Sequence, residues 1–97
     1  MATFIGLVNY TDQGIRSVKD AIGRAGAARK TLADMGGEFR EYFLTMGTYD
    51  FVIIFDAPSD RVAATFLLGL GQAGNVRTTT LKAFTEAEFH DIVADLP

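Results

Sequence analysis

Polar and aromatic residues gather at one end of the predicted strands, where a binding site could form. They provide two phenols, a guanidinium, a carboxylate, an amide and a hydroxyl: Asn9, Tyr10, Tyr49, Asp50, Arg77 and Thr78. Phenols can donate hydrogen bonds or protons, an arginine can hold an anionic group, and a carboxylate can orient the arginine. Such groups at the rim of an apolar sheet are typical of a small-molecule site. We therefore expect these six residues to bind a ligand.

The same residues also allow a purely structural interpretation. Asp50 and Thr78 would end strands by bonding to the hairpin backbone, and Tyr10 and Tyr49 would pack as rim aromatics. The two interpretations differ in one measurable respect, because only a ligand site needs a cavity beside the phenols.

Few other residues could carry chemistry. The chain contains no cysteine and one histidine, His90, which lies in an acidic segment and is expected at the surface. Closed metal sites need several converging ligands, so we expect no metal and no cofactor. Arg29 falls on the apolar stripe of its predicted helix, where it is either paired or extends past the helix edge to solvent. With so few candidate groups, the sequence leaves catalysis open.

Length and composition limit the class of protein. The 97 residues fit a single domain, and a hydrophobic content of 48% disfavours a disordered chain. The net charge is −3, and in the most basic segment, 16–30, Arg16, Asp20 and Arg24 are spaced as ion pairs on a helix. We therefore expect no nucleic-acid partner. No apolar run approaches the ~20 residues of a membrane span and no signal peptide is recognisable, which predicts a cytoplasmic protein without a membrane partner.

Hydrophobic periodicity and turn residues divide the chain into strands and helices. Strands are expected at 3–10, 38–46, 50–56 and 76–84, helices at 12–35 and from Ser59 to Gly71, and a short last helix from Thr85 to about residue 95. The expected apolar stripe of the first helix consists of Ile15, Val18, Ile22, Ala25 and Leu32. Gly36-Gly37 should end this helix, and Gly47-Thr48 should make a tight hairpin.

The order of these elements predicts an α+β fold. A βαββαβ chain with both helices on one face is the ferredoxin-like arrangement, with a four-stranded antiparallel sheet whose first and third strands are central. The run Phe51–Phe55 is apolar on both of its faces. Helices can cover one face, and the simplest cover for the other is the sheet of a second subunit, giving a homodimeric α/β barrel. In the alternative, the last helix at 86–95 folds back over that face.

The run from Met46 to Ile54, Met-Gly-Thr-Tyr-Asp-Phe-Val-Ile-Ile, resembles the signature of the GYD domain family. That family is named for a glycine, tyrosine and aspartate at this hairpin, and here Thr48 separates the glycine from the tyrosine. Supporting motifs stand in the right order along the whole chain, which is identified as a single GYD-like domain, 1–97. They are Gly36-Gly37, Ala57-Pro58, Gly74 to Thr78, and Phe84-Thr85.

The resemblance implies the dimeric α/β-barrel superfamily but no particular activity, since fold does not select function. That superfamily includes cofactor-free monooxygenases, isomerases and ligand-sensing domains. We expect a small-molecule-binding domain that pairs with itself, including the case of a cofactor-independent enzyme acting on a small apolar or carbonyl compound. The alternative is a non-catalytic ligand-sensing or assembly module.

Overall fold

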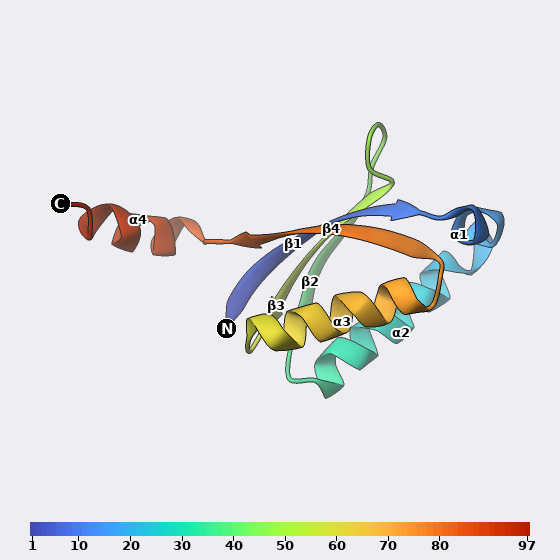
Figure 1. The fold of residues 1–97 in the computed structure, drawn as a ribbon, viewed down its shortest axis with the longest axis horizontal. Coiled ribbons are helices and arrows are strands. Elements are labelled where there is room, and N and C mark those ends of the chain that lie inside the picture. The colour runs from blue at the N-terminus through green and yellow to red at the C-terminus, as the bar shows by residue number, and fades with distance from the viewer.

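Four antiparallel strands form one sheet in the order β2-β3-β1-β4 (Figure 1). The computed structural model describes all residues, 1–97. The elements are β1 (Ala2–Tyr10), α1 (Asp12–Arg16), the 3-10 helix η1 (Val18–Asp20), α2 (Ala21–Asp34), β2 (Glu38–Leu44), β3 (Phe51–Ala57), α3 (Asp60–Gln72), β4 (Val76–Ala83) and α4 (Glu86–Ala94). Strands β1 and β3 are central, so the expected ferredoxin-like α+β fold is confirmed. No helix is long and apolar enough to cross a membrane.

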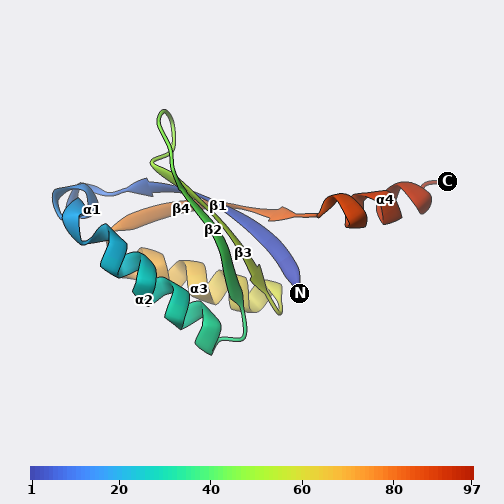
Figure 2. The same cartoon turned by 180° about the vertical axis from the view of Figure 1, so that it is seen from behind.

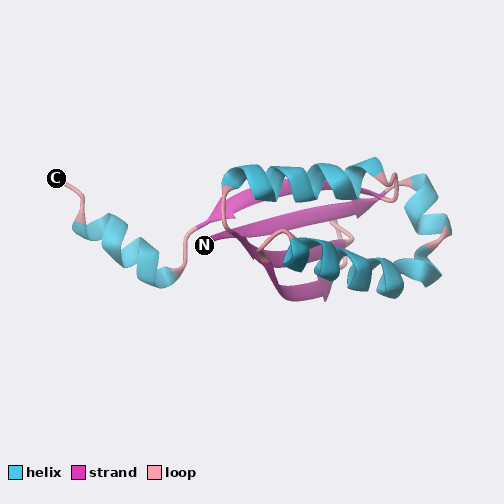
Figure 3. Cartoon of the chain, turned by 90° about the horizontal axis from the view of Figure 1, so that it is seen from below, coloured by secondary structure: helices cyan, strands magenta, loops and turns pink.

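The core lies between one face of the sheet and the helices α2 and α3, which run side by side beneath it (Figures 1 and 3). Side chains of a strand alternate between the two faces of the sheet. Accordingly Phe51, Ile53 and Phe55 of β3 are buried on the helix side. Leu32 of α2 and Phe66 of α3 close over them, both almost fully buried.

The opposite face of the sheet is apolar in its centre and is covered by nothing in this chain. Ile5 and Leu7 of β1 and Val52 and Ile54 of β3 alternate with the buried residues and are only partly exposed. The helix α4 continues from the end of β4 away from the sheet, and all its residues are exposed (Figure 2). The alternative in which residues 86–95 fold back over the sheet is therefore wrong.

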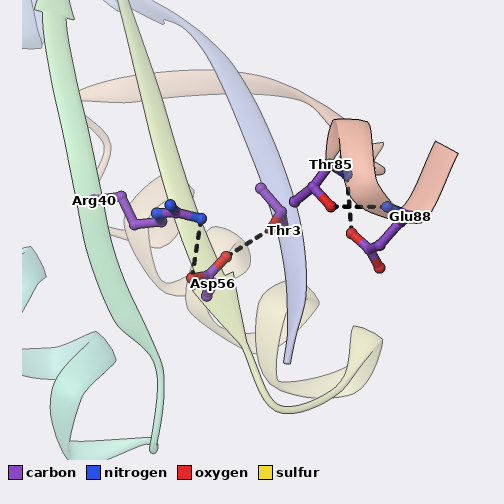
Figure 4. A network of polar contacts seen from close by, with 5 residues as sticks. All are labelled: Thr3, Arg40, Asp56, Thr85 and Glu88. Carbon is purple, nitrogen blue, oxygen red and sulfur yellow. Dashed lines mark hydrogen bonds and ion pairs between the residues drawn. The ribbon is translucent and has the colours of Figure 1, made fainter. Parts of the chain in front are cut away.

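Polar groups replace apolar ones at one end of this uncovered face. Thr3 Oγ1 donates a 2.7 Å hydrogen bond to Asp56 Oδ1, and Arg40 pairs with Asp56 Oδ2 at 3.5 Å, so the contacts join β1, β3 and β2 (Figure 4). The capping box that begins α4 lies nearby in the same view. In this box the Thr85 hydroxyl accepts from the Glu88 amide, and the Glu88 carboxylate accepts from the Thr85 amide.

The helix expected at 12–35 is interrupted at Ser17, which corrects the prediction. Arg24 Nη1 donates to the Ser17 carbonyl at 3.0 Å and to Ser17 Oγ at 3.1 Å, and its Nη2 donates to the Gly14 carbonyl at 3.4 Å. The Gly14 carbonyl lies in the last turn of α1, where helix carbonyls lack a helical partner, and the Ser17 carbonyl also accepts from the Asp20 amide at 2.9 Å. Arg24 therefore forms its hydrogen bonds at the interruption between α1 and α2. The expected ion pairs of Asp20 with Arg16 and with Arg24 do not form.

The interruption also changes which residues of the segment point inward. Ile15, Val18 and Ile22, expected on the buried stripe, are 52%, 41% and 88% exposed. Ala25 and Leu32 of the expected stripe do face inward, joined by Ala21, Ala28 and, just past the end of α2, Met35. Apart from Arg24, the inward side of the first half of α2 thus carries small residues.

The turn between β2 and β3 is wider than the tight hairpin expected at Gly47-Thr48. The strands stop at Leu44 and restart at Phe51, and the Thr45 amide donates to the Asp50 carbonyl at 2.9 Å. Gly47 has a φ of 108°, in the left-handed region that favours glycine. The tip of this hairpin projects on the side of the sheet away from the helices (Figure 1).

Candidate ligand cavity

A cavity of about 430 Å³ opens between α2, α3 and the sheet. Fourteen of the nineteen residues that line it are hydrophobic. A volume of this order, with an apolar wall and few polar groups, is typical of small-molecule sites.

Small side chains on the two helices leave this space. Ala21, Ala25 and Ala28 of α2 line it on one side, and Gly69 of α3 and Ala73, the residue that caps α3, line it on the other, where larger residues would fill the core. Protein interiors are normally packed to crystal-like density, so a hollow at this position is a property of these particular residues.

Aromatic rings from the sheet form the wall of the cavity opposite the helices. The ring of Phe51 lies between those of Tyr10, at a centroid distance of 5.3 Å, and Tyr42, at 4.8 Å. The Tyr42 and Phe51 planes are nearly parallel, with an angle of 10° between them. The two phenols therefore bring their polar ends to an otherwise apolar wall.

The Tyr42 phenol keeps its proton over a wider pH range than an ordinary tyrosine. Burial, followed in importance by the neighbouring Tyr10 hydroxyl, raises the pKa of Tyr42, against a smaller opposing effect of Arg24 and Arg29. At physiological pH the Tyr42 hydroxyl is protonated, as an ordinary tyrosine hydroxyl is, and can donate a hydrogen bond.

Arg24 supplies the positive charge of the cavity wall. Its side chain is half-buried, lines the cavity, and is fixed on its outer side by Ser17 and Gly14. Arg29, on the same helix, lies elsewhere: its guanidinium carbon is 5.1 Å from the centroid of the Phe39 ring, in a cation–π contact.

Three of the six residues expected to form a site are joined at the end of β1. Asn9 Nδ2 donates to the Thr48 carbonyl at 2.8 Å, and the Tyr10 amide donates to Asp50 Oδ2, also at 2.8 Å. Tyr10 is also the member of the set whose side chain lines the cavity. Asn9 and Asp50 hold the hairpin against β1.

The other three expected residues lie apart from the cavity. Arg77 and Thr78 border a second, more open hollow between β4 and α3. Tyr49 lines neither hollow, and its carbonyl accepts a 2.6 Å hydrogen bond from Thr45 Oγ1. The structure therefore does not bring Tyr49 and Arg77 to the same pocket as Tyr10, and a ligand role for these six residues stays a prediction.

The chain contains no cluster of the side chains that commonly bind metal ions. No group of three or more histidine, cysteine or carboxylate side chains is arranged to hold an ion. The side chain of His90 is 72% exposed and lies 3.8 Å from Glu86 Oε1 on the same helix, as expected for a surface histidine.

Sequence reasoning did not single out Tyr42 and Arg24. Tyr42 was one of several apolar residues in its strand, and Arg24 was assigned to a surface ion pair. One available signal was the row of alanines at 21, 25 and 28, because a helix whose inward side is small, facing aromatic strands, predicts a hollow.

Two comparisons with known proteins give matches that cover nearly the whole chain. A family model described as GYD domain matches residues 4–93. A curated protein of Thermus thermophilus, described as a glutamine synthetase and cystathionine beta-lyase binding protein, is 32% identical over 97 residues, which cover 99% of each chain. No solved structure matches the sequence.

Proposed function

Because the chain belongs to the GYD domain family, we propose that it is a small binding module whose cavity takes up a small, mostly apolar molecule. The observation that carries this proposal is the 430 Å³ cavity with its apolar wall. Burial of an apolar ligand there is favourable by roughly 25 cal/mol for each Å² removed from water.

Binding without catalysis agrees best with the groups on the cavity wall. Its titratable side chains are Tyr10, Tyr42 and Arg24, with no carboxylate, imidazole or thiol among the lining residues. General acid–base catalysis near neutral pH needs a group whose pKa lies near the working pH, and a tyrosine with a raised pKa is poorly suited to it.

An uncharged aromatic probe, 2-naphthamide, tests this proposal by its effect on amide chemical shifts. We expect the largest shifts at cavity residues such as Ala25, Ala28 and Phe51, and none on the uncovered sheet face at Ile5 and Val52. Ala28→Phe should abolish them by filling the cavity. Ala33→Phe, on the exposed side of the same helix, should leave them intact. Shifts clustered on the sheet face, or no shifts at millimolar probe, would refute a binding cavity.

The module is also proposed to act as a homodimer. The uncovered sheet face supports this, because Ile5, Leu7, Val52 and Ile54 place an apolar patch at its centre and monomeric proteins rarely leave such patches contiguous. Stacking two such faces would remove both patches from water and give the dimeric barrel.

A second candidate function is the binding of other proteins. It is supported by the name of the Thermus protein and by the hairpin tip, where Leu44 is 76% and Met46 is 99% exposed. Titration of the chain with purified glutamine synthetase of its own organism tests this function. Met46→Asp should weaken the complex, and Leu68→Asp, at an exposed position on α3, should not; equal effects of the two variants, or no complex, would exclude this role of the tip.

A further inference from the structure

The polar groups at the cavity have an unusual balance of charge. A guanidinium and two phenols line it, and none of its nineteen lining residues carries a negative charge. The acidic side chains of the chain outnumber the basic ones, twelve to nine. The cavity is therefore a locally positive place in a negatively charged protein.

Arg24 has no carboxylate partner. The ion pairs of the chain join Lys30 to Asp34, Arg40 to Asp56, Lys82 to Asp60, and His90 to Glu86. The neutral oxygens of Ser17 and Gly14 fix its position but do not neutralise its charge. A half-buried cation beside an apolar wall has lost part of its hydration. A bound anion stabilises it, because the attraction and the charge-assisted hydrogen bonds between the two charges offset the hydration that both lose on burial.

Tyr42 adds a hydrogen-bond donor to the wall of the same cavity. A tyrosine hydroxyl is protonated at neutral pH, and the positive charges of Arg24 and Arg29 both act on the pKa of Tyr42. Of the five N–H donors of the Arg24 guanidinium, those of Nη1 face Ser17 and one of Nη2 faces the Gly14 carbonyl, which leaves the Nε and second Nη2 N–H groups for the two oxygens of a carboxylate. The polar part of the wall thus offers hydrogen-bond donors and positive charge to an acceptor with negative charge.

Resting on the proposed function, we infer that the cavity selects aromatic or apolar carboxylates over their neutral counterparts. Arg24 and Tyr42 hold the carboxylate, and the body of the ligand lies against Phe51 and the alanines of α2. A charge-assisted hydrogen bond is stronger than a neutral one, so Arg24 should supply most of the preference.

Calorimetric titration with 2-naphthoate and the isosteric 2-naphthamide tests this inference. The wild-type chain should bind the acid about tenfold or more tightly than the amide. Arg24→Gln should reduce this ratio to about threefold or less while the amide affinity stays within about twofold. Arg24→Lys, which keeps the charge but loses the fork, should retain an intermediate ratio. Lys30→Gln removes an exposed positive charge of the same helix that does not line the cavity; it is the matched control and should leave the ratio unchanged.

The ratio of affinities separates this inference from the function on which it rests. Equal binding of acid and amide by the wild type, with both lost in Ala28→Phe, would keep the cavity as a ligand site and overturn the selection of carboxylates. An acid preference that survives Arg24→Gln would overturn the role of Arg24. If neither probe binds, or if both still bind to Ala28→Phe, the proposed function fails as well. If Arg24→Gln does not fold, Arg24→Lys provides the test: an intermediate ratio supports the role of Arg24, and an unchanged ratio overturns the role of its planar fork.

Discussion

The rings of Tyr42 and Phe51 lie stacked on one wall of the cavity, with centroids 4.8 Å apart. This relationship joins an edge strand to a central strand and places Tyr42, whose pKa is raised by burial, beside the cavity. It keeps the Tyr42 ring in place even when the hydroxyl is removed, so Tyr42→Phe is a mild substitution.

Tyr42→Phe should change how stability depends on pH. Below the ordinary tyrosine pKa of about 10, folded and unfolded chains both keep this proton, and stability is unaffected. Above it, the unfolded chain releases the proton while burial raises the folded pKa of Tyr42, so the free energy of unfolding falls. Urea unfolding from about pH 9 to about pH 11 should show a shallower decline for Tyr42→Phe than for the wild type. Parallel curves would contradict the raised pKa.

Gly14→Ala should destabilise the fold by about 2 kcal/mol or more. A Cβ at Gly14 would overlap the carbonyl oxygen of Asn75, which is itself held by the Thr11 amide at 3.1 Å. Gly23→Ala is the matched control, because a Cβ there meets nothing within 4 Å, and it should stabilise α2 by about 1 kcal/mol. Equilibrium unfolding in urea measures both, and a neutral Gly14→Ala would show that the α1 backbone can move away from Asn75.

Val52→Asp should convert the proposed homodimer to a monomer. Val52 lies on the uncovered face of β3, and a charge buried there without a partner costs several kcal/mol. Light scattering at micromolar concentration should give twice the 10.5 kDa chain mass for the wild type and for Leu68→Asp, a control on the outer side of α3. A monomeric wild type would contradict the inference of a homodimer from the uncovered apolar face of the sheet.

Asp50→Ala should cost about 1–2 kcal/mol of stability and leave affinity for the naphthalene probes unchanged. Asp50 Oδ2 is already occupied by the Tyr10 amide, so the carboxylate has a structural partner. Asp34→Ala, which removes an exposed ion pair with Lys30, should change stability by less than about 0.5 kcal/mol. A loss of probe affinity in Asp50→Ala would restore Asp50 to the ligand site.

The helix caps could be predicted because each depends on local signals, and the strand order because the order of the elements and the handedness of their connections restrict it. Ser59 and Thr85 accept hydrogen bonds from amides three residues ahead, and Gly36, with a φ of 86°, lies just past the end of α2. Apolar residues on both faces of β3 were likewise visible as an unbroken run. These features need no knowledge of distant contacts.

The break at Ser17 and the cavity could not be predicted in the same way. The break involves Arg24, seven positions further on, which bonds to Ser17, and Gly14, which fits only against Asn75. The six residues expected to form a site do not all line one pocket, because a shared end of the sheet does not fix which face a side chain points to. Tyr10 pairs with Val76, so Arg77, one position further along β4, lies on the opposite face.

The separation of α4 from the domain has a consequence for its dynamics. Its nine residues bury no side chain in their own chain, and helices this short are marginal in water. The amide protons of α4 should then exchange with solvent through local opening, long before those of β1 and β3, which are released only when the domain unfolds. Slow exchange in α4 would require a covering surface from another chain, so hydrogen exchange along residues 86–94 measures assembly directly.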